Sequence, residues 1–490
     1  MYKSHLILHR ITLSFLFAVC FSLLLTMAAF GSVKEGIDLY KQGKVDAAIT
    51  AMKQAADENQ KDPTSRRWLG FLLLKKQQYA EALVPLQEAR ALNADGAELR
   101  NNLGMAYLGT KEYEKAVVEL EQAIKMSKDS SESFNNLGNA YYRLNQFDKA
   151  IDAYTKAAEI APNDYNVHNN MGVSLRESGK VAEAIAEFKK AQELAPKDVE
   201  VALNLAWALK SKKNYAPAQV AFEKALAIDP NNYSAHLGLA EVFSALGATD
   251  KALAQYEAAA GIKPNEFTPN YNVGALYSKQ GKFAKAVTAF QAALKAKPDD
   301  VEATAYLGWA MFKTGNSSEG IAKLKLAVEK DPKFLPAWLN LATIYTKENN
   351  AAEAINAWQS AVKLAHGNIG AAINLGNLYL QNDKPEDALA QYQAAAKIDA
   401  NSAEAYFGQG AALSKLGKVD DSIAQYRKAI ELNPKMADAY NNLGAEIEKK
   451  GQLEEAKELY RKAIQIDPNN ADAKRNLERF KEQPAMSKEG

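Results

Sequence analysis

Side chains that could catalyse a reaction or hold a metal ion are few and scattered in this 490-residue sequence. Outside the N-terminal segment the histidines are His168, His236 and His366, and no two of them share a predicted helix at the spacing of a metal site. The single cysteine, Cys20, lies in a hydrophobic N-terminal run, so the rest of the sequence has no thiol nucleophile or thiolate ligand. We therefore expect no catalytic residue, no metal site and no cofactor.

Neither the motifs nor the net charge predicts binding to phosphate groups. Glycine-lysine pairs such as Gly179-Lys180 and Gly281-Lys282 lack the upstream glycine and the following serine or threonine of a phosphate-binding loop. We interpret them as turn residues. The 60 basic and 59 acidic side chains nearly cancel, so no excess of charge favours a nucleic acid or an anionic membrane surface as partner.

Residues 1–31 have the composition of an export signal. Lys3 and Arg10 precede residues 11–29, a run without a charged side chain. This run is close to the ~20 residues that span a bilayer, so the alternatives are a cleaved signal peptide and an uncleaved signal anchor that tethers the protein to the membrane. A buried first helix is disfavoured because the run is apolar on every side. Lipid attachment at Cys20 is disfavoured because Val19, not a small residue, precedes it. We expect an exported protein of the periplasm or cell envelope.

The remainder of the sequence repeats every 34 residues. A small residue recurs at this interval thirteen times without an insertion, and an alanine follows nineteen residues later in every unit. We expect the small residues to lie where two helices cross, because large side chains would separate the helix axes. These residues are Gly36, Gly70, Gly104, Gly138, Gly172, Ala206, Ala240, Gly274, Gly308, Ala342, Gly376, Gly410 and Gly444.

Each unit has the apolar pattern of two amphipathic helices. In the fourth unit Leu137 and Tyr141 lie one helical turn apart, and Ile151 and Tyr154 do so again after a short gap. Asn145 in this gap, replaced by glycine in seven other units, predicts a left-handed residue that ends the first helix. A proline in eight units predicts the end of the second helix.

These residues resemble the signature of the tetratricopeptide repeat family, which is carried by Leu137-Gly138, Tyr141, Ala150, Tyr154, Ala157 and Pro162. The resemblance covers residues 29–470 and implies an all-α, right-handed solenoid of about thirteen helix-turn-helix repeats. The repeats are expected at residues 29–62, 63–96, 97–130, 131–164, 165–198, 199–232, 233–266, 267–300, 301–334, 335–368, 369–402, 403–436 and 437–470. Residues 471–490 are expected to form a charged capping helix and a tail.

Two units depart from the family pattern. The first has Glu35 where leucine is expected and Gln60 where proline is common, so we expect a frayed N-terminal cap there. The ninth repeat has Ser317 and Gly320 where other units have an aromatic residue and an alanine. We expect this repeat to form the weakest joint of the array.

The resemblance also implies that the first helix of each pair lines a concave groove that binds peptides or proteins. Two residues before the small position, eight of thirteen units carry an asparagine, namely Asn102, Asn136, Asn170, Asn204, Asn272, Asn340, Asn374 and Asn442. Because an amide both donates and accepts, such a column could bond the backbone of an extended peptide. The column is similar to the asparagine ladder of O-GlcNAc transferases, although this sequence contains no transferase domain. The alternative is that the amides bond only within the array.

Large apolar residues occupy neighbouring positions of the expected groove in later units. They are Trp207, Tyr271, Tyr306, Trp309 and Phe312. An apolar strip of this kind suggests contact with a partner segment, with a lipid-like ligand or with a second copy of the protein. The alternative is closer packing between neighbouring first helices.

Taken together, the sequence predicts a non-enzymatic scaffold or adaptor that binds a protein or an extended peptide. The export signal and the family resemblance favour a role in cell-envelope assembly, secretion or polymer export. A targeting or assembly subunit of a transferase complex, with its catalytic chain separate, is the alternative. The sequence predicts neither the identity of the partner nor the oligomeric state.

Overall fold

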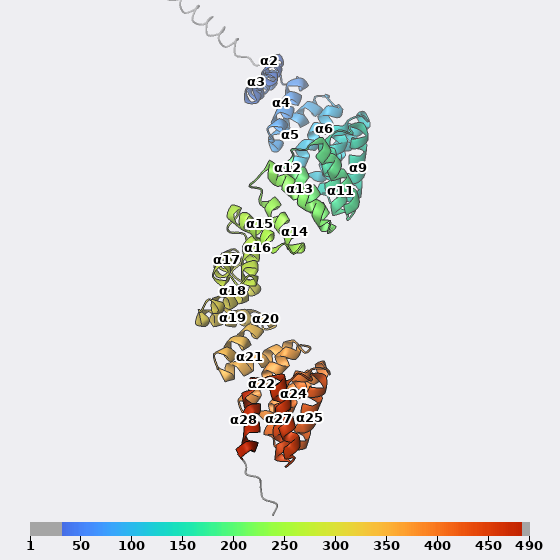
Figure 1. The fold of residues 1–490 in the computed structure, drawn as a ribbon. Helices are drawn as coiled ribbons and strands as arrows, with labels where there is room; N and C mark the ends of the chain where they lie inside the picture. Colours follow the sequence, from blue (N-terminus) through green and yellow to red (C-terminus); the bar gives the residue numbers. More distant parts are fainter. Residues whose placement is uncertain (1–31, 483–490) are drawn as a thin grey trace, which may run out of the picture. The chain divides into compact units, whose positions relative to one another are not determined.

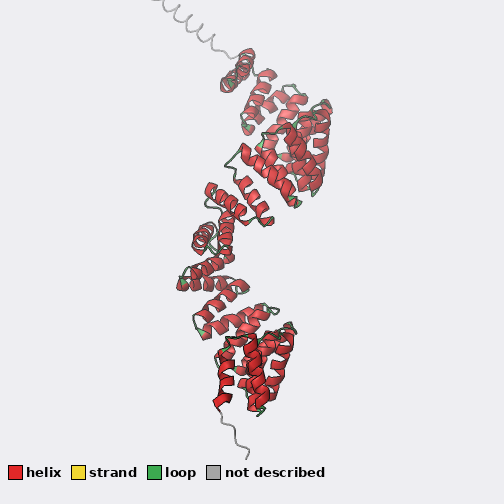
Figure 2. Cartoon of the chain, in the orientation of Figure 1, coloured by secondary structure: helices red, strands yellow, loops and turns green. Residues whose placement is uncertain are grey.

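A computed structural model describes residues 32–482, and this range consists of α-helices and turns without a strand (Figure 2). The predicted all-α helical repeat is therefore confirmed. None of the helices within residues 32–482 has the length and apolar character needed to cross a membrane. The predicted signal or anchor at residues 1–31 and the tail after residue 482 lie outside the described residues.

The helices follow one another as pairs joined by short turns, and Figure 1 shows their order along the chain. The earlier helices are α2 (Val33–Lys41), α3 (Val45–Glu58), α4 (Pro63–Lys75), α5 (Tyr79–Ala91), α6 (Ala97–Gly109), α7 (Tyr113–Met126), α8 (Ser131–Arg143), α9 (Phe147–Ile160), α10 (Tyr165–Glu177), α11 (Val181–Leu194), α12 (Val199–Ser211), α13 (Tyr215–Ile228), α14 (Tyr233–Ala245) and α15 (Thr249–Ile262). The later helices are α16 (Phe267–Lys279), α17 (Phe283–Ala296), α18 (Val301–Lys313), α19 (Ser317–Lys330), α20 (Leu335–Lys347), α21 (Ala351–Leu364), α22 (Ile369–Gln381), α23 (Pro385–Ile398), α24 (Ala403–Lys415), α25 (Val419–Leu432), α26 (Ala437–Lys449), α27 (Leu453–Ile466) and α28 (Ala471–Glu482). The chain divides into two compact units, here unit 1 (to Gln255) and unit 2 (from Tyr256).

Local side-chain chemistry explains where many of the first helices begin. Before α4, the carboxylate of Asp62 accepts hydrogen bonds from the backbone N–H groups of Thr64 and Ser65, at 3.0 and 3.2 Å. Asp198 and Asp300 do the same before α12 and α18. A side-chain acceptor at this point satisfies N–H groups that have no partner within the helix, and its negative charge suits the positive end of the helix dipole.

The turn inside each hairpin contains a residue with positive φ, as the sequence predicts. Asn145 has φ of 58° and Gly43 has φ of 77°. The same position is also left-handed where the sequence offers neither glycine nor asparagine, for example at Gln77, Lys111 and Lys213. An L-residue is strained in this conformation, so the closure of the hairpin and not the residue type decides the backbone there.

The small residues of the first helices are sockets for large side chains of the second helices. A Cβ atom added to Gly138 would lie 2.5 Å from the ring of Tyr154, and one added to Gly376 would lie 2.8 Å from Tyr392. These tyrosines are 1% exposed. Gly408, in the following repeat, also faces Tyr392, since a Cβ there would lie 2.4 Å from its ring. Tyr392 therefore packs within its own hairpin and against the next one.

The two helices of the ninth repeat pack closely against each other, and the expectation that this repeat forms the weakest joint with its neighbours stays a prediction. The helices α18 and α19 approach so closely that a Cβ atom added to Gly320 would lie 2.6 Å from the backbone oxygen of Gly308. Gly320 therefore permits a direct backbone contact and leaves no gap. Leu324, which fills the socket at Gly308, is fully buried.

The C-terminal helix covers the last hairpin, as the sequence predicts. In α28, Leu477 and Phe480 pack against the apolar core that contains Tyr460. The ring centroids of Phe480 and Tyr460 lie 6.2 Å apart. Lys474 and Arg475 on the same helix are exposed. One apolar and one charged face are what an end cap of a helical array requires.

Candidate functional site

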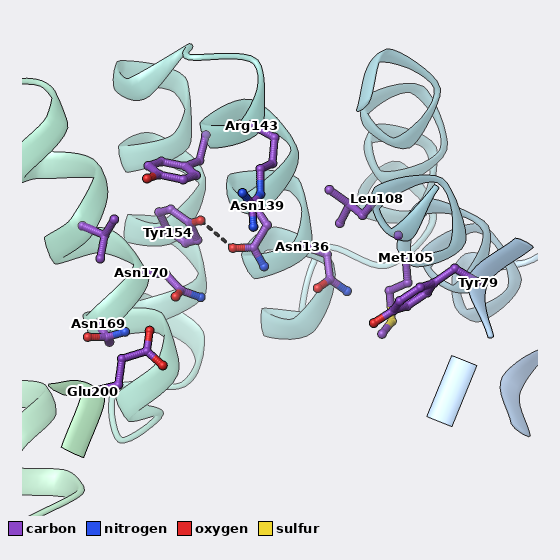
Figure 3. A pocket seen from close by; sticks show the side chains of 13 residues that line it. Tyr79, Met105, Leu108, Asn136, Asn139, Arg143, Tyr154, Asn169, Asn170 and Glu200 are labelled. Carbon is purple, nitrogen blue, oxygen red and sulfur yellow. Dashed lines mark hydrogen bonds between the residues drawn. The ribbon is translucent and has the colours of Figure 1, made fainter. Parts of the chain in front are cut away.

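The first helices of unit 1 line an open cavity of about 590 Å³. Figure 3 shows side chains from α6, α8 and α10 directed into this space, with Tyr79 of α5 and Glu200 of α12 at its margins. Its lining residues are Tyr79, Met105, Leu108, Gly109, Asn136, Asn139, Tyr142, Arg143, Tyr154, Asn169, Asn170, Val173 and Glu200. The cavity is thus built by several repeats, and its lining is rich in amide side chains.

Helical spacing brings these side chains to one wall. On α8, Asn136, Asn139 and Arg143 are three and four residues apart, so they project from one face. Asn170 and Val173 repeat the first two positions on α10. The regular stacking of hairpins then places equivalent faces side by side.

The asparagines of this wall form hydrogen bonds with one another between neighbouring first helices. The Nδ2 atom of Asn136 donates to Oδ1 of Asn101 at 3.0 Å, and Nδ2 of Asn170 donates to Oδ1 of Asn135 at 3.2 Å. Asn204 donates in the same way to Asn169, at 3.0 Å. These bonds support the alternative in which the amides bond within the array.

The bonds between asparagines use only part of the amide chemistry. Each side-chain amide has two N–H donors and a carbonyl oxygen with two acceptor sites. In the described part of the chain, the Oδ1 atoms of Asn136 and Asn170 accept no hydrogen bond from the protein. Bonding within the array therefore orients these amides and leaves acceptors available to a ligand in the cavity.

The cavity carries one positive and one negative side chain. The guanidinium of Arg143 lies 6.0 Å from the ring centroid of Tyr142, and within residues 32–482 it forms no ion pair with a carboxylate. Glu200 is exposed at the other margin.

The hydroxyl of Tyr154 donates to Oδ1 of Asn139 at 2.7 Å, and burial raises the pKa of this tyrosine. The tyrosine is therefore a neutral donor that orients Asn139.

The other predicted asparagines do not join this cavity. Asn102 is 7% exposed and does not line it. In unit 2, Asn272 donates to the backbone oxygen of Thr268 in its own helix, at 2.9 Å, and Asn442 bonds the hydroxyl of Tyr426 at 3.4 Å. Asn340 is partly buried, and Asn374 is exposed. These asparagines therefore differ in their hydrogen-bond partners and exposure, and their role in binding a peptide stays a prediction.

The predicted apolar residues are partly buried and packed against neighbouring side chains. In unit 1, Trp207 meets the edge of Phe222 with centroids 5.2 Å apart, and its Nε1 donates to Ser234 at 3.1 Å. In unit 2 the centroids of Tyr271 and Tyr306 lie 6.4 Å apart. This contact joins neighbouring first helices, as the packing alternative requires.

The remaining pair of apolar residues also lies in unit 2. The rings of Trp309 and Phe312 are 5.6 Å apart, and both pack against the core. The amino group of Lys313 lies over Trp309 at 5.4 Å, and that of Lys347 lies over Phe312 at 5.6 Å. Both rings therefore have aliphatic and cationic neighbours within the protein.

Several cavity residues were missed from the sequence, above all Asn139, Tyr142 and Arg143. Among the residues that line this cavity, only Asn136 and Asn170 had been assigned to the groove from the sequence. Trp309 and Phe312, which occupy the positions of Asn139 and Tyr142 in a later repeat, had also been assigned to it. The next turn of the same helix face, three to seven residues beyond Asn136, carries the missed side chains. Extending the helical face by two turns would have found them.

Two histidines, His168 and His236, have structural roles. His168 is 1% exposed, and its ring nitrogens lie 2.6 Å from the carboxylate of Glu187 and 3.0 Å from the backbone oxygen of Pro162. His236 makes the equivalent contacts with Gln255 and Pro230, at 2.7 and 3.0 Å. Within residues 32–482 there is also no group of histidine, cysteine, aspartate and glutamate side chains arranged to hold a metal ion.

Comparison with known families gives matches along most of the chain. Models described as tetratricopeptide repeat match residues 33–97, 131–164, 165–198, 211–272, 274–333, 335–366 and 437–470. A further model, described as TPR repeat, matches residues 110–145, 376–417 and 410–445. No curated protein matches the chain.

Solved structures of repeat proteins are similar to parts of the chain. The TPR protein YrrB, described as having an unusual peptide-binding site, is 24% identical, and the match covers 39% of this chain and 99% of YrrB with a TM-score of 0.36. The Pseudomonas aeruginosa protein pilF is 20% identical over 44% of this chain and 97% of its own, with a TM-score of 0.39. The C-terminal part of a TPR protein from Cytophaga hutchinsonii is 22% identical over 49% of this chain and 98% of its own, with a TM-score of 0.43.

Tetratricopeptide repeat proteins generally act as scaffolds that bind proteins or peptides. With repeat models matched from residue 33 to residue 470, this chain belongs to the tetratricopeptide repeat family.

Proposed function

We propose that this protein is a non-catalytic scaffold that holds an extended segment of a partner protein in the amide-lined cavity of unit 1. The observation that supports the proposal is the cavity of about 590 Å³, in which oriented asparagines keep unused acceptors. An extended peptide presents backbone N–H and C=O groups at regular intervals, and amides can bond both. Arg143 and Glu200 add two charges that would select side chains of the segment.

A photo-crosslinking amino acid at Val173 tests this site, because Val173 lines the cavity. We expect it to form a covalent adduct with one partner segment in cells. The same amino acid at Val118, which is 57% exposed and lies outside the cavity, is the control and should give no such adduct.

The double variant Arg143→Ala/Asn170→Ala completes the test. It removes two lining side chains that are not part of the apolar core, so the helical content and melting temperature should change little. The adduct at Val173 should be lost in this variant. An adduct of undiminished yield would show that Arg143 and Asn170 do not hold the segment, which would contradict the proposed amide-lined site. A catalytic transferase chain as the captured partner would favour the alternative of an assembly subunit.

We also propose that the scaffold works in cell-envelope assembly, secretion or polymer export, after export by residues 1–31. The support is the uncharged run at residues 11–29, preceded by Lys3 and Arg10. A phosphatase that folds only in the periplasm, fused after Lys34, should be active. An inactive, stable fusion would instead favour a cytoplasmic adaptor.

A further inference from the structure

A buried histidine of unit 1 has an oxygen atom beside each nitrogen of its ring. His168 of α10 is 1% exposed. Its Nε2 atom lies 3.0 Å from the backbone oxygen of Pro162, and its Nδ1 atom lies 2.6 Å from the carboxylate of Glu187 in α11. A carbonyl oxygen only accepts hydrogen bonds, so Nε2 carries a proton. Nδ1 and the ionised carboxylate would then face each other with lone pairs unless a second proton lies between them.

The contact with the proline carbonyl recurs at the same position of later repeats. Nε1 of Trp338 donates to the backbone oxygen of Pro332 at 3.0 Å, and Nδ2 of Asn270 donates to that of Pro264 at 2.9 Å. An indole nitrogen can only donate. Nε2 of His168 therefore stands in the place of a donor, which leaves Nδ1 to meet the carboxylate.

The pair of positions occupied by His168 and Glu187 is filled differently in two other repeats of unit 1. In the third repeat Arg100 bonds Glu119 at 2.7 Å, so this place accommodates a cation beside a carboxylate. In the seventh repeat Nδ1 of His236 lies 2.7 Å from the amide of Gln255. An amide can donate or accept, so a neutral ring satisfies that contact. Only the fifth repeat joins a titratable base to a carboxylate.

Other charged groups of the surrounding elements do not replace Glu187 as the partner of the ring. Within residues 32–482, no other charged side chain forms a hydrogen bond or an ion pair with His168. These other groups are Asp164 before α10, Lys156 on α9, Glu183 and Lys190 on α11, Arg143 on α8 and Glu200 on α12.

The histidine adjoins a wall of the amide-lined cavity. Asn169 and Asn170 follow it directly on α10, and both line the cavity opposite side chains of α8 (Figure 3). Pro162 lies in the turn before α10, and Glu187 lies on α11. The two bonds of His168 therefore hold the wall formed by α10 to its neighbours on both sides.

We infer that His168 and Glu187 form a proton-dependent lock that holds α10 in place, so that the cavity binds an extended segment more tightly at pH 6 than at pH 8. A free histidine loses its proton near pH 6.5, so the contribution of the lock is complete below this pH and is lost as the pH rises further. Without the second proton the bond to α11 is lost, and α10 can shift relative to α8. This regulation rests on the proposed function of the cavity.

Melting temperatures of the full chain between pH 5.5 and 8.5 test the lock without a ligand. Glu187→Gln gives His168 the amide partner that His236 has. The advantage of the wild type over this variant should shrink by about 2 °C or more as the pH rises. Gln255→Glu installs a second lock at His236, and it should lose about 2 °C relative to the wild type over the same range.

A second variant at the lock serves if Glu187→Gln does not fold, as judged by circular dichroism. His168→Asn retains a donor towards Pro162, as Asn270 shows at the equivalent position, and it cannot titrate. Its melting temperature should depend on pH as that of Glu187→Gln does.

A displayed library of random twelve-residue peptides, selected at pH 6 on the purified full chain, supplies the probe for the cavity. The peptide used is acetylated, contains no histidine or cysteine, and does not bind Arg143→Ala/Asn170→Ala. Between pH 6 and 8 its dissociation constant should rise about fivefold or more for the wild type and stay constant for Glu187→Gln. Gln255→Glu should behave as the wild type does, because neither α14 nor α15 lines the cavity. If an adduct forms at Val173 but no such peptide is selected, the segment found in the adduct replaces it.

The outcomes separate the lock from the proposed function. Equal pH slopes of melting in the wild type, Glu187→Gln and His168→Asn would overturn the inference. So would a dissociation constant that does not change with pH in the wild type, or that changes equally in Glu187→Gln. In those cases loss of the Val173 adduct in Arg143→Ala/Asn170→Ala would still support the proposed function. Failure to select a peptide, together with no adduct at Val173, would overturn both.

Discussion

At the scale of single residues, the packing of this protein depends on small residues of the first helices. Because they lack a large side chain, they leave space that large side chains of the second helices fill. Gly138 and Tyr154, or Gly376 and Tyr392, cannot be exchanged independently, because an added Cβ would overlap the ring. The fully buried tyrosines are also coupled to pH, since burial raises their pKa values. Two predictions belong to this scale.

The first concerns Gly320, which stands where most repeats have alanine. Gly320→Ala restores the common residue, but its Cβ would meet the backbone oxygen of Gly308. We expect a loss of about 1–3 kcal/mol in the free energy of unfolding, as for other overpacked sites. Gly261→Ala in α15 is the control, because no atom lies within 4 Å of its added Cβ, and it should be neutral or stabilising by up to about 1 kcal/mol. Urea unfolding of both variants distinguishes the cases, and stabilisation by Gly320→Ala would contradict the close backbone approach.

The second concerns alkaline pH. Burial raises the pKa of Tyr392 to about 12, above the ~10 of an unfolded tyrosine. The folded state therefore holds the phenol proton more tightly, and the stability that this contributes is complete below about pH 10 and is lost as the pH rises towards the folded pKa. Tyr392→Phe should lose less stability than the wild type between pH 9 and 11, although its missing hydrogen bond to Asn377 should cost about 1 kcal/mol at pH 7. Melting temperatures over this range test the prediction, and equal slopes for both proteins would refute it.

At the scale of helices, hydrogen bonds and ion pairs between polar side chains join neighbouring helices in addition to the apolar core. The carboxylate of Glu119 in α7 bonds Arg90 of α5 at 2.6 Å and Arg100 of α6 at 2.7 Å. Asp95 holds the other edge of the Arg100 guanidinium at 2.6 Å. Since Glu119 is 7% exposed, this network fixes three helices around one buried charge, much as Asn136 joins α8 to α6 through Asn101.

Removing the charge of Glu119 tests this network. Glu119→Gln should destabilise the protein by about 1–3 kcal/mol, because both guanidiniums lose a charged acceptor in a largely buried place. Glu159→Gln is the control, since Glu159 and its partner Lys156 are more than half exposed, at 57% and 58%. The control should cost less than about 1 kcal/mol. Denaturant unfolding measures both, and equal effects would show that burial does not strengthen the Glu119 network.

At the scale of the whole chain, stability is a sum of contacts between neighbouring hairpins. Separate core clusters follow one another, such as the cluster around Leu86 and Leu103 in unit 1 and the cluster around Leu341 and Tyr379 in unit 2. In such a repeat array a local perturbation weakens adjacent repeats before it reaches remote ones.

Ala225→Leu tests this behaviour. Ala225 lies fully buried in α13, so the larger side chain should cost about 1–3 kcal/mol by overpacking. Amide hydrogen exchange should accelerate most in α12, α13 and α14 and least in α2–α5 of the same unit. A uniform acceleration along the chain would indicate a single cooperative fold instead.

The sequence by itself determined the elements of this protein. Interactions within one or two helical turns determine the helix pairs, the cap at α28 and turn residues such as Asn145. The residue types that make these interactions, and their 34-residue period, can be read directly from the sequence. The left-handed turns at Gln77 and Lys111 were not predictable from residue type, because the closure of the hairpin sets their backbone.

Only the tertiary structure decided which partners the side chains on the faces of the first helices bond. Whether Asn136 and Asn170 bond a neighbour or a ligand depends on the rotation and distance of adjacent first helices. That rotation is set by many packed side chains at once, among them close approaches such as Gly308 against Gly320, and no local pattern encodes it. For the same reason the cavity beside Arg143 became visible only when separate repeats were brought side by side.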